Sequence, residues 1–306
     1  MSNNWTTENI PDLNEKVIII TGGNSGIGFE SAKEFARKGA RAVLACRSMD
    51  KAQTALNLIL EEIPDAKAEV MQLDLMSLKS IRKFAEEFKT KYKRLDVLLN
   101  NAGIMMVPYG KTEDGFERQL GTNHLGHFAL TGLLIDLILK TPNARIANVS
   151  STGHNFGEMD FENLMFEGGD DYSPMKAYGR SKLANLLFTY ELQRKFETSG
   201  AGVIAVAAHP GMANTHLADH LFNKFPFILM KPFSGLVVQS SAMGALPSIR
   251  ASVDPEVKGG QYFGPDGKRE AKGYPVLVES NGSSHNAGDA QKLWEMSESL
   301  TGITFL

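Results

Sequence analysis

Two side chains with complementary chemistry, Tyr178 and Lys182, lie four residues apart in a segment with a helical pattern. Residues with this spacing share one face of a helix, so the two can lie together. A nearby ammonium stabilises a phenolate, and we expect Lys182 to lower the tyrosine pKa from about 10. Tyr178 could then act as a general acid toward a carbonyl group, and as a general base in the reverse direction.

The same spacing also occurs at Tyr172 and Lys176, so the pair at 178 and 182 is not unique in the chain. Pro174 lies between Tyr172 and Lys176. Because proline favours the first turn of a helix, we expect Tyr172 to lie outside the helix that carries Tyr178.

A hydroxyl donor is expected at the end of the strand predicted over 145–149, where Ser150 and Ser151 are adjacent. Neighbouring residues of a strand point to opposite faces, so only one of these serines can face a cleft. That hydroxyl could donate a hydrogen bond to a substrate oxygen as the oxygen gains negative charge.

A glycine-rich turn, TGGNSGIG at 21–28, joins a predicted strand to a predicted helix. A helix N-terminus presents unpaired N–H groups and a positive dipole, which favour a bound pyrophosphate. Glycines let the backbone approach the phosphates closely. The spacing Gly22-x3-Gly26-x-Gly28 therefore predicts a dinucleotide site, although a tight turn without a ligand has the same pattern.

The end of the second predicted strand bears on the choice between NAD(H) and NADP(H). An NAD site usually places an acid there, whereas NADP requires a cation for the 2′-phosphate. This strand ends with Cys46 and Arg47 and has no acid. A guanidinium matches phosphate geometry, so we expect NADP(H) to be preferred. The alternative is that Arg47 is an ordinary solvated surface residue.

Short β-branched runs alternate with helical patterns, which is typical of a parallel sheet covered by helices. We expect a Rossmann-like α/β fold, a three-layer α/β/α sandwich with about seven strands in the order 3-2-1-4-5-6-7. The predicted strands are 17–20, 42–46, 68–73, 97–99, 145–149, 203–208 and 261–263, and the predicted helices are 26–38, 50–63, 78–92, 113–139, 174–197 and 289–299.

Composition narrows the class of protein. The chain has 306 residues, and its 32 Lys+Arg against 35 Asp+Glu give a net charge of −3. That balance disfavours a nucleic-acid partner. No apolar run is long enough for a transmembrane anchor, and the polar N-terminal segment does not resemble a signal peptide. We therefore expect a cytoplasmic protein with one domain over 1–306; the single cysteine excludes an intramolecular disulfide.

An apolar segment at 213–233, rich in aromatic residues, interrupts the regular alternation. We expect it to form a lid over the substrate, which favours a lipophilic substrate. An ordinary surface helix, a dimer contact and a membrane-surface contact are the alternatives.

Two histidine pairs have spacings that could hold a metal on one helix face: His124 with His127, and His216 with His220. No acid or cysteine clusters with either pair in the sequence, so we expect no metal. His209 is expected to be structural.

The motifs together resemble those of the classical short-chain dehydrogenase/reductase family, over essentially the whole chain. They are TGGNSGIG at 21–28, Asp74-Leu75, NNAG at 100–103, Asn123, VSS at 149–151, YGRSK at 178–182 and HPG at 209–211. Within the family, the sequence is similar to the retinol dehydrogenase and WW-domain oxidoreductase branch. The matching stretches are LACRS at 44–48, TNHLGHF at 122–128, YGRSKLANLLF at 178–188 and HPGMANT at 209–215.

The resemblance implies roles for individual residues. Tyr178 would be the catalytic acid/base, Lys182 would also hold the nicotinamide ribose, Ser151 rather than Ser150 would bind the substrate oxygen, and Asn123 would hold a water that links Lys182 to solvent. Asp74, followed by Leu75, would bind the adenine amino group. The remaining cofactor contacts would come from Thr21, Gly22, Asn24, Ser25, Gly26, Ile27, Gly28, Arg47, Asn101, Ala102, Gly103, Pro210, Gly211 and Thr215.

The expected activity is NADP(H)-dependent interconversion of a small-molecule carbonyl and its alcohol. A redox-sensing protein that binds NADP(H) without turnover is the alternative, but the tyrosine and lysine that such proteins typically lose are both present. The resemblance also implies a homodimer or homotetramer that pairs through the helices predicted at 113–139 and 174–197. The membrane anchor and WW modules of relatives have no counterpart here, so their location and partners are not carried over.

Overall fold

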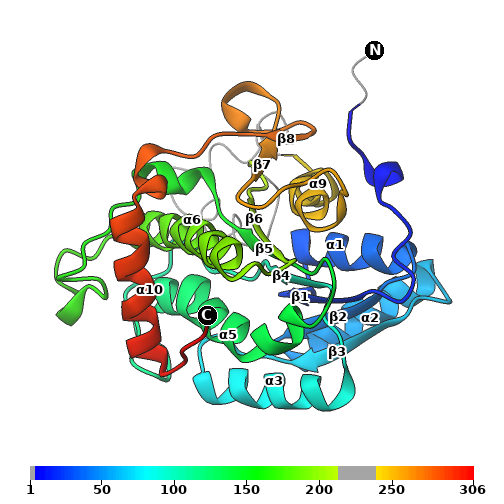
Figure 1. Ribbon diagram of the computed structural model, residues 1–306, viewed down its shortest axis with the longest axis horizontal. Helices are drawn as coiled ribbons and strands as arrows, with labels where there is room; N and C mark the ends of the chain where they lie inside the picture. Colours follow the sequence, from blue (N-terminus) through cyan, green and yellow to red (C-terminus); the bar gives the residue numbers. More distant parts are fainter. Residues whose placement is uncertain (1–3, 213–238) are drawn as a thin grey trace.

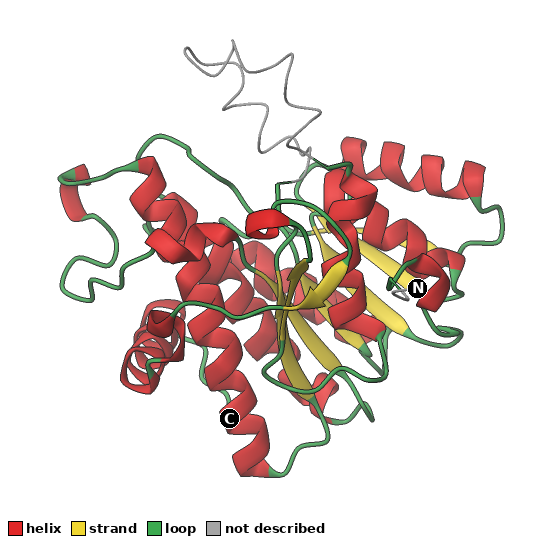
Figure 2. Ribbon diagram, turned by 90° about the horizontal axis from the view of Figure 1, so that it is seen from above, coloured by secondary structure: helices red, strands yellow, loops and turns green. Residues whose placement is uncertain are grey.

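The computed structural model describes residues 4–212 and 239–306, and in these ranges the chain forms one eight-stranded sheet with helices on both faces (Figures 1 and 2). The strands are β1 Val17–Thr21, β2 Arg41–Cys46, β3 Ala68–Gln72, β4 Val97–Asn100, β5 Arg145–Val149, β6 Ile204–Ala208, β7 Tyr262–Pro265 and β8 Pro275–Leu277. The α-helices are α1 Gly26–Arg37, α2 Met49–Glu62, α3 Leu78–Lys91, α4 Arg118–Leu120, α5 Gly126–Leu139, α6 Pro174–Ser199, α9 Ser241–Val253 and α10 Ala287–Thr301. Shorter helical turns are η1 Thr7–Asn9, η2 Gly121–Leu125, η3 Thr152–Phe156, η4 Glu167–Gly169, η6 Lys268–Glu270 and η7 Gly282–His285.

The strand order is β3-β2-β1-β4-β5-β6-β7-β8, and every neighbouring pair is parallel except β7 with β8. The expected fold class and the order of the first seven strands are confirmed. The antiparallel strand β8 and the helix α9 were not predicted. Pro247 lies inside α9, where proline normally argues against a helix.

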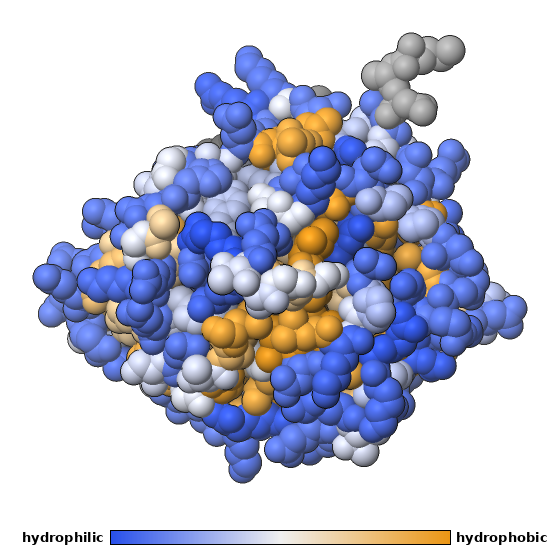
Figure 3. Space-filling model, in the orientation of Figure 1, coloured by the Kyte–Doolittle hydropathy of each residue, from blue (hydrophilic) through white to orange (hydrophobic). Residues whose placement is uncertain are grey.

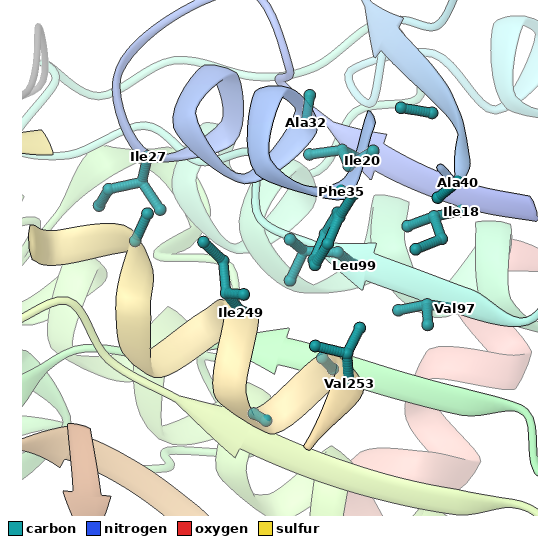
Figure 4. Packing of buried hydrophobic residues seen from close by; sticks show 14 of the residues in the cluster. Ile18, Ile20, Ile27, Ala32, Phe35, Ala40, Val97, Leu99, Ile249 and Val253 are labelled. Carbon is teal, nitrogen blue, oxygen red and sulfur yellow. The ribbon is translucent and has the colours of Figure 1, made fainter. Parts of the chain in front are cut away.

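Alternate residues of the central strands supply two separate cores. Ile18 and Ile20 of β1 face α1, α2 and α9, while Ile19 packs with α3, α5 and α6 on the opposite face. Figure 4 shows the first core, in which Phe35 of α1 and Ile249 of α9 meet over the sheet. A sheet buried on both faces explains why the β1 sequence is continuously apolar.

The helix predicted over 113–139 is wrong in its first part, because regular helix starts at Arg118. Glu117 is the N-cap residue, and its carboxylate accepts hydrogen bonds from the backbone N–H groups of Gln119 and Leu120. Before it, Thr112 N donates to Phe116 O and Phe116 N donates to the Thr112 hydroxyl, which closes a turn in which Gly115 adopts a positive φ of 88°. A π-helical turn, η2, then joins α4 to α5.

The C-terminal part of the chain covers the helices that were expected to pair between subunits. Trp294 of α10 packs against Phe128 of α5 and Phe188 of α6, and Phe305 adds to the same aromatic group. Figure 3 shows a largely hydrophilic face with an apolar patch that remains over α5. Because α10 already covers part of α5 and α6, that part of their surface is not available for a contact between subunits. The oligomeric state itself stays a prediction.

Candidate active site

The carboxyl ends of β1, β4, β5 and β6 lie at one edge of the sheet, because these strands are parallel neighbours. The glycine turn follows β1, the loop 101–103 follows β4, Ser151 follows β5, and Pro210 follows β6. The sheet thus brings together motifs that are far apart in the sequence. Thr215 and the segment 213–233 lie outside the described residues, as do His216 and His220.

The glycine turn has the geometry that close approach of a ligand to a helix N-terminus requires. Gly22 and Gly26 have positive φ angles of 67° and 54°. A Cβ at Gly28 would lie 2.4 Å from the carbonyl oxygen of Gly22, so a larger residue cannot occupy this position. Ser25 is the N-cap of α1 but makes no side-chain capping hydrogen bond, and the first turn has no acid. These features fit a bound pyrophosphate.

The adenine side of the expected cofactor site lies at the ends of β2 and β3. Arg47 is exposed directly after β2, and its guanidinium contacts the Met76 sulfur at 3.5 Å. Burial raises the pKa of the Cys46 thiol to about 12, so this residue adds no negative charge beside Arg47. The Asp74 carboxylate accepts a hydrogen bond from Met76 N at 2.9 Å, and Leu75 is buried.

Two of the expected catalytic groups, Tyr178 and Lys182, lie on the same face of α6. The Lys182 Nζ atom is 5.8 Å from the centre of the Tyr178 ring. Lys182 is buried, and its ammonium donates a hydrogen bond to Val149 O at 3.0 Å, which ties α6 to the end of β5. Tyr172 precedes α6, where its hydroxyl donates to Val107 O, so its expected place outside the helix is confirmed.

The two adjacent serines differ in exposure and in hydrogen-bond partners. Ser150 is buried, and its hydroxyl donates to Lys182 O at 2.8 Å. The Ser151 hydroxyl is partly exposed and accepts a hydrogen bond from Gly153 N at 3.0 Å. A Cβ at Gly153 would lie 2.9 Å from the Tyr178 ring and 3.3 Å from the Ser151 hydroxyl oxygen, so these two side chains are neighbours.

Burial dominates the protonation of both α6 residues. It raises the pKa of the Tyr178 phenol above its ordinary value, and a hydrogen bond with Ser151 lowers that pKa by less. The expectation of a lowered tyrosine pKa is therefore wrong for this structure: the phenol carries its proton at neutral pH. Burial also lowers the pKa of the Lys182 ammonium to about 8.

Asn123 lies in the π-helical turn η2, a type of turn that occurs often at functional sites. Its side-chain oxygen accepts from Ile104 N at 2.8 Å, and its amide group donates to Ile104 O and to the Ser181 hydroxyl. A Cβ at Gly103 would lie 3.1 Å from this oxygen and 3.6 Å from Lys182 Nζ. Asn123 therefore connects the loop after β4 to α6, and its expected water relay stays a prediction.

The three described histidines considered in the sequence analysis, His124, His127 and His209, each have different hydrogen-bond partners. His124 Nε2 lies 2.9 Å from the Ser297 hydroxyl, while His127 contacts Thr21 and the Asn123 carbonyl. His209 is fully buried, and its Nε2 lies 2.8 Å from the Glu270 carboxylate. Within residues 4–212 and 239–306, no group of three or more His, Cys, Asp or Glu side chains could hold a metal.

The motifs do not predict Gln239, which holds the loop after β6. Its side-chain amide donates to Pro210 O at 2.7 Å and accepts from Gly273 N at 3.0 Å, and its backbone N–H donates to Met212 O. A Cβ at Gly211 would lie 2.5 Å from Ala271 O, so this loop packs closely on the segment after β7. A cavity of about 1090 Å³ lies between these segments, with Thr152, Met212 and Gln239 in its lining.

Comparison with known proteins agrees with this geometry. The short chain dehydrogenase family model matches residues 16–225. Mouse (Mus musculus) retinol dehydrogenase 12 is 42% identical over 290 residues, which cover 94% of this chain and 87% of the relative. Human (Homo sapiens) retinol dehydrogenase 13 is 40% identical over 293 residues, with 94% and 85% covered.

Solved structures show the same fold. An uncharacterized protein from Mycobacterium paratuberculosis is 38% identical, with a TM-score of 0.83 over 99% of this chain and 100% of its own. A short-chain dehydrogenase from Shigella flexneri, complexed with NADP, has a TM-score of 0.63 at 22% identity, over 82% and 97%.

This chain belongs to the short-chain dehydrogenase family, and its expected placement in the retinol dehydrogenase-like branch is confirmed. It is an oxidoreductase of alcohol and carbonyl groups, from a family that binds nicotinamide cofactors. In the part of the chain that the structure describes, every helix is too short or too polar to cross a bilayer.

The buried ammonium of Lys182 predicts a specific pH dependence of stability. Its pKa is about 8 in the folded chain, against an ordinary value of 10.5 for a lysine, so between these values the unfolded state binds more protons. Stability then rises with pH. Relative to Lys182→Met, the free energy of unfolding of the unsubstituted protein should rise by about 2 kcal/mol from pH 7 to pH 10.

Urea titrations at several pH values measure this difference. Lys176 is an exposed lysine of the same helix, so Lys176→Met should run parallel to the unsubstituted protein. If the Lys182→Met curve also runs parallel, the assignment of a lowered lysine pKa is wrong.

Proposed function

We propose that the protein is an NADP(H)-dependent oxidoreductase that interconverts a lipophilic aldehyde or ketone and its alcohol, with Tyr178 as the general acid and base. The observation that carries the proposal is the convergence of Tyr178, Ser151 and Lys182 beside the glycine turn at one edge of the sheet. NADPH, when bound, supplies the hydride for carbonyl reduction.

The raised pKa of Tyr178 suits the reducing direction, because the phenol then holds the proton that the substrate oxygen must receive. Ser151 lies next to Tyr178 and can donate a second hydrogen bond to the same oxygen. Lys182 places a cation behind the phenol, which stabilises the phenolate left after proton transfer.

Two features at the end of β2 support NADP(H) over NAD(H). Arg47 is exposed at the end of β2, and the neutral Cys46 replaces the acid that would repel a phosphate. The glycine turn would hold the pyrophosphate, and Asp74 would bind the adenine. The loop 101–103 would line the ribose, while Pro210 and Gly211 would lie near the nicotinamide.

The proposal of a lipophilic substrate rests on the apolar composition of 213–233 and on relatives whose names specify retinol, an apolar alcohol. The cytoplasmic location and the single domain stay predictions.

Tyr178→Phe should lower kcat for carbonyl reduction by at least about 100-fold, because general acid catalysis contributes roughly 10²–10⁴-fold. NADPH binding should change little. Tyr172→Phe is the matched control, since Tyr172 has the same spacing to a lysine but lies outside α6. Steady-state kinetics and NADPH fluorescence titration measure both quantities. Unchanged turnover in Tyr178→Phe would rule out its role as the acid.

Arg47→Ala should weaken NADPH binding by about 10- to 150-fold, the value of a charge-assisted hydrogen bond of roughly 1.5–3 kcal/mol. NADH binding should be nearly unchanged. Arg41 is exposed at the opposite end of β2, so Arg41→Ala is the control and should bind both cofactors normally. An equal loss for NADPH and NADH would mean that Arg47 acts through packing.

A series of straight-chain aldehydes from three to ten carbons tests the lipophilic substrate. Each CH₂ buried in the site is expected to add ~0.8 kcal/mol, so kcat/KM should rise with chain length. Sugars and hydroxy acids serve as polar comparisons. A flat profile, or a preference for the polar compounds, would contradict the proposed substrate class.

A further inference from the structure

His127, the second residue of α5, has hydrogen-bonding contacts at both ring nitrogens in the interior of the protein. Only 2% of the residue is exposed. Its Nδ1 lies 2.9 Å from the backbone carbonyl of Asn123, and its Nε2 lies 2.9 Å from the Thr21 hydroxyl. The imidazole therefore spans the gap between the π-helical turn η2 and the end of β1.

These two contacts fix a single tautomer. A carbonyl oxygen can only accept, so Nδ1 must carry the proton. Burial lowers the pKa of His127 to about 4, which leaves the ring neutral at the pH values where enzymes are assayed. A neutral imidazole has one N–H, so Nε2 must accept a hydrogen bond from the Thr21 hydroxyl.

The Thr21 hydroxyl also connects the two segments proposed to hold the cofactor, the glycine turn 21–28 and the loop 101–103, which together we call the cofactor cradle. Its oxygen accepts hydrogen bonds from the backbone N–H groups of Asn101 and Ala102, both at 2.9 Å. Thr21 also directly precedes the glycine turn, and Thr21 O accepts from the Asn101 side chain at 2.8 Å. The hydroxyl has one proton and a second possible acceptor, Leu99 O at 3.4 Å, but the contact with His127 Nε2 is shorter at 2.9 Å and is the one that the neutral ring requires. The Thr21 hydroxyl therefore holds the loop after β4 against the end of β1.

The other ring nitrogen of His127, Nδ1, contacts the backbone of Asn123, one of the proposed catalytic residues. Asn123 binds Ile104 and Ser181 through its side chain, and its side-chain oxygen lies beside the same glycine as Lys182 Nζ. A displacement of the Asn123 backbone would therefore change the surroundings of the Lys182 ammonium.

We propose that His127 is a positioning residue of this oxidoreductase, which joins the cofactor cradle at Thr21 to the catalytic turn at Asn123 through a neutral imidazole of fixed tautomer. The inference rests on the proposed function. It adds a residue that touches neither substrate nor cofactor and acts through its two partners.

The neighbouring His124 provides a matched control. It is equally buried, lies in the π-helical turn η2 beside Asn123 and contacts Phe128 and Phe188, but its hydrogen-bond partner is Ser297 of α10 rather than Thr21. Both His127→Phe and His124→Phe replace a buried imidazole with an apolar ring. Thermal unfolding shows how much each variant loses in stability.

His127→Phe should weaken NADPH binding and lower kcat, each by roughly 5- to 50-fold, because buried hydrogen-bonding groups at Thr21 and Asn123 lose a partner. His124→Phe should leave both within about twofold of the unsubstituted protein, whatever its melting temperature. Equal behaviour of the two variants in NADPH affinity and in kcat would overturn the proposal.

Two shorter substitutions separate the two contacts. His127→Asn can donate to the Asn123 carbonyl but does not reach Thr21, so it should recover most of kcat and leave NADPH binding weak. His127→Gln can accept from the Thr21 hydroxyl instead, so it should recover NADPH affinity and leave kcat low. Identical patterns in these two variants would contradict a role as a bridge.

A readout without turnover separates this inference from the proposed function. Nitrogen-15 NMR of labelled histidine should show His127 as the Nδ1–H tautomer, without titration from pH 5 to pH 9. A titrating or Nε2–H form would contradict the inference even in an active enzyme. Absence of carbonyl reduction would contradict the proposed function alone, because the tautomer and the NADPH affinities are measured independently.

Discussion

The relative positions of the candidate catalytic groups depend on one buried contact, the hydrogen bond from the Lys182 ammonium to the carbonyl oxygen of Val149. It joins the middle of α6 to the last residue of β5. Asn185 donates to the same carbonyl, and Ser150 donates back to Lys182 O, so three hydrogen bonds hold helix and strand together. Tyr178 and Ser151 take their relative positions from this junction. A cation so placed is costly to desolvate, which is why the pKa of Lys182 falls to about 8.

Polar side chains continue from this junction through the middle of the sheet. Asn148 of β5 donates to Thr189 of α6 and accepts from Asn100 of β4, which also donates to Thr131 of α5. These four side chains are buried, and a buried polar group is costly unless it is hydrogen-bonded. The sheet and its two covering helices are thus held in one register near the site, where apolar packing alone would tolerate small shifts.

Charge is distributed differently at the two ends of the candidate site. On the adenine side, Arg47 is exposed and its neighbour Cys46 is a neutral thiol. On the catalytic side, the phenol of Tyr178 is protonated, and the charge of Lys182 is buried behind it. An anionic ligand group is therefore favoured at the end of β2, whereas Tyr178 and Ser151 offer hydroxyl donors that suit a neutral oxygen.

The sequence by itself determined the fold class and the order of the first seven strands. Local rules carry this information. A continuous apolar run predicts a strand buried on both faces, as in β1. A glycine is needed at position 28 because a Cβ there would strike Gly22 O, and the four-residue spacing puts Tyr178 and Lys182 on one helix face.

Only the tertiary structure decided how those groups are held and charged. Spacing suggested a lowered tyrosine pKa, but burial of Tyr178 has the opposite effect, and burial depends on the packing of distant segments. The start of the helix at Arg118 depends on the Glu117 cap, and α9 forms despite Pro247. The two partners of His127 come from β1 and from η2, and Thr21 lies 106 positions away in the chain. Such contacts arise only when the parallel sheet places its strand ends together, because no local pattern encodes a partner so far away.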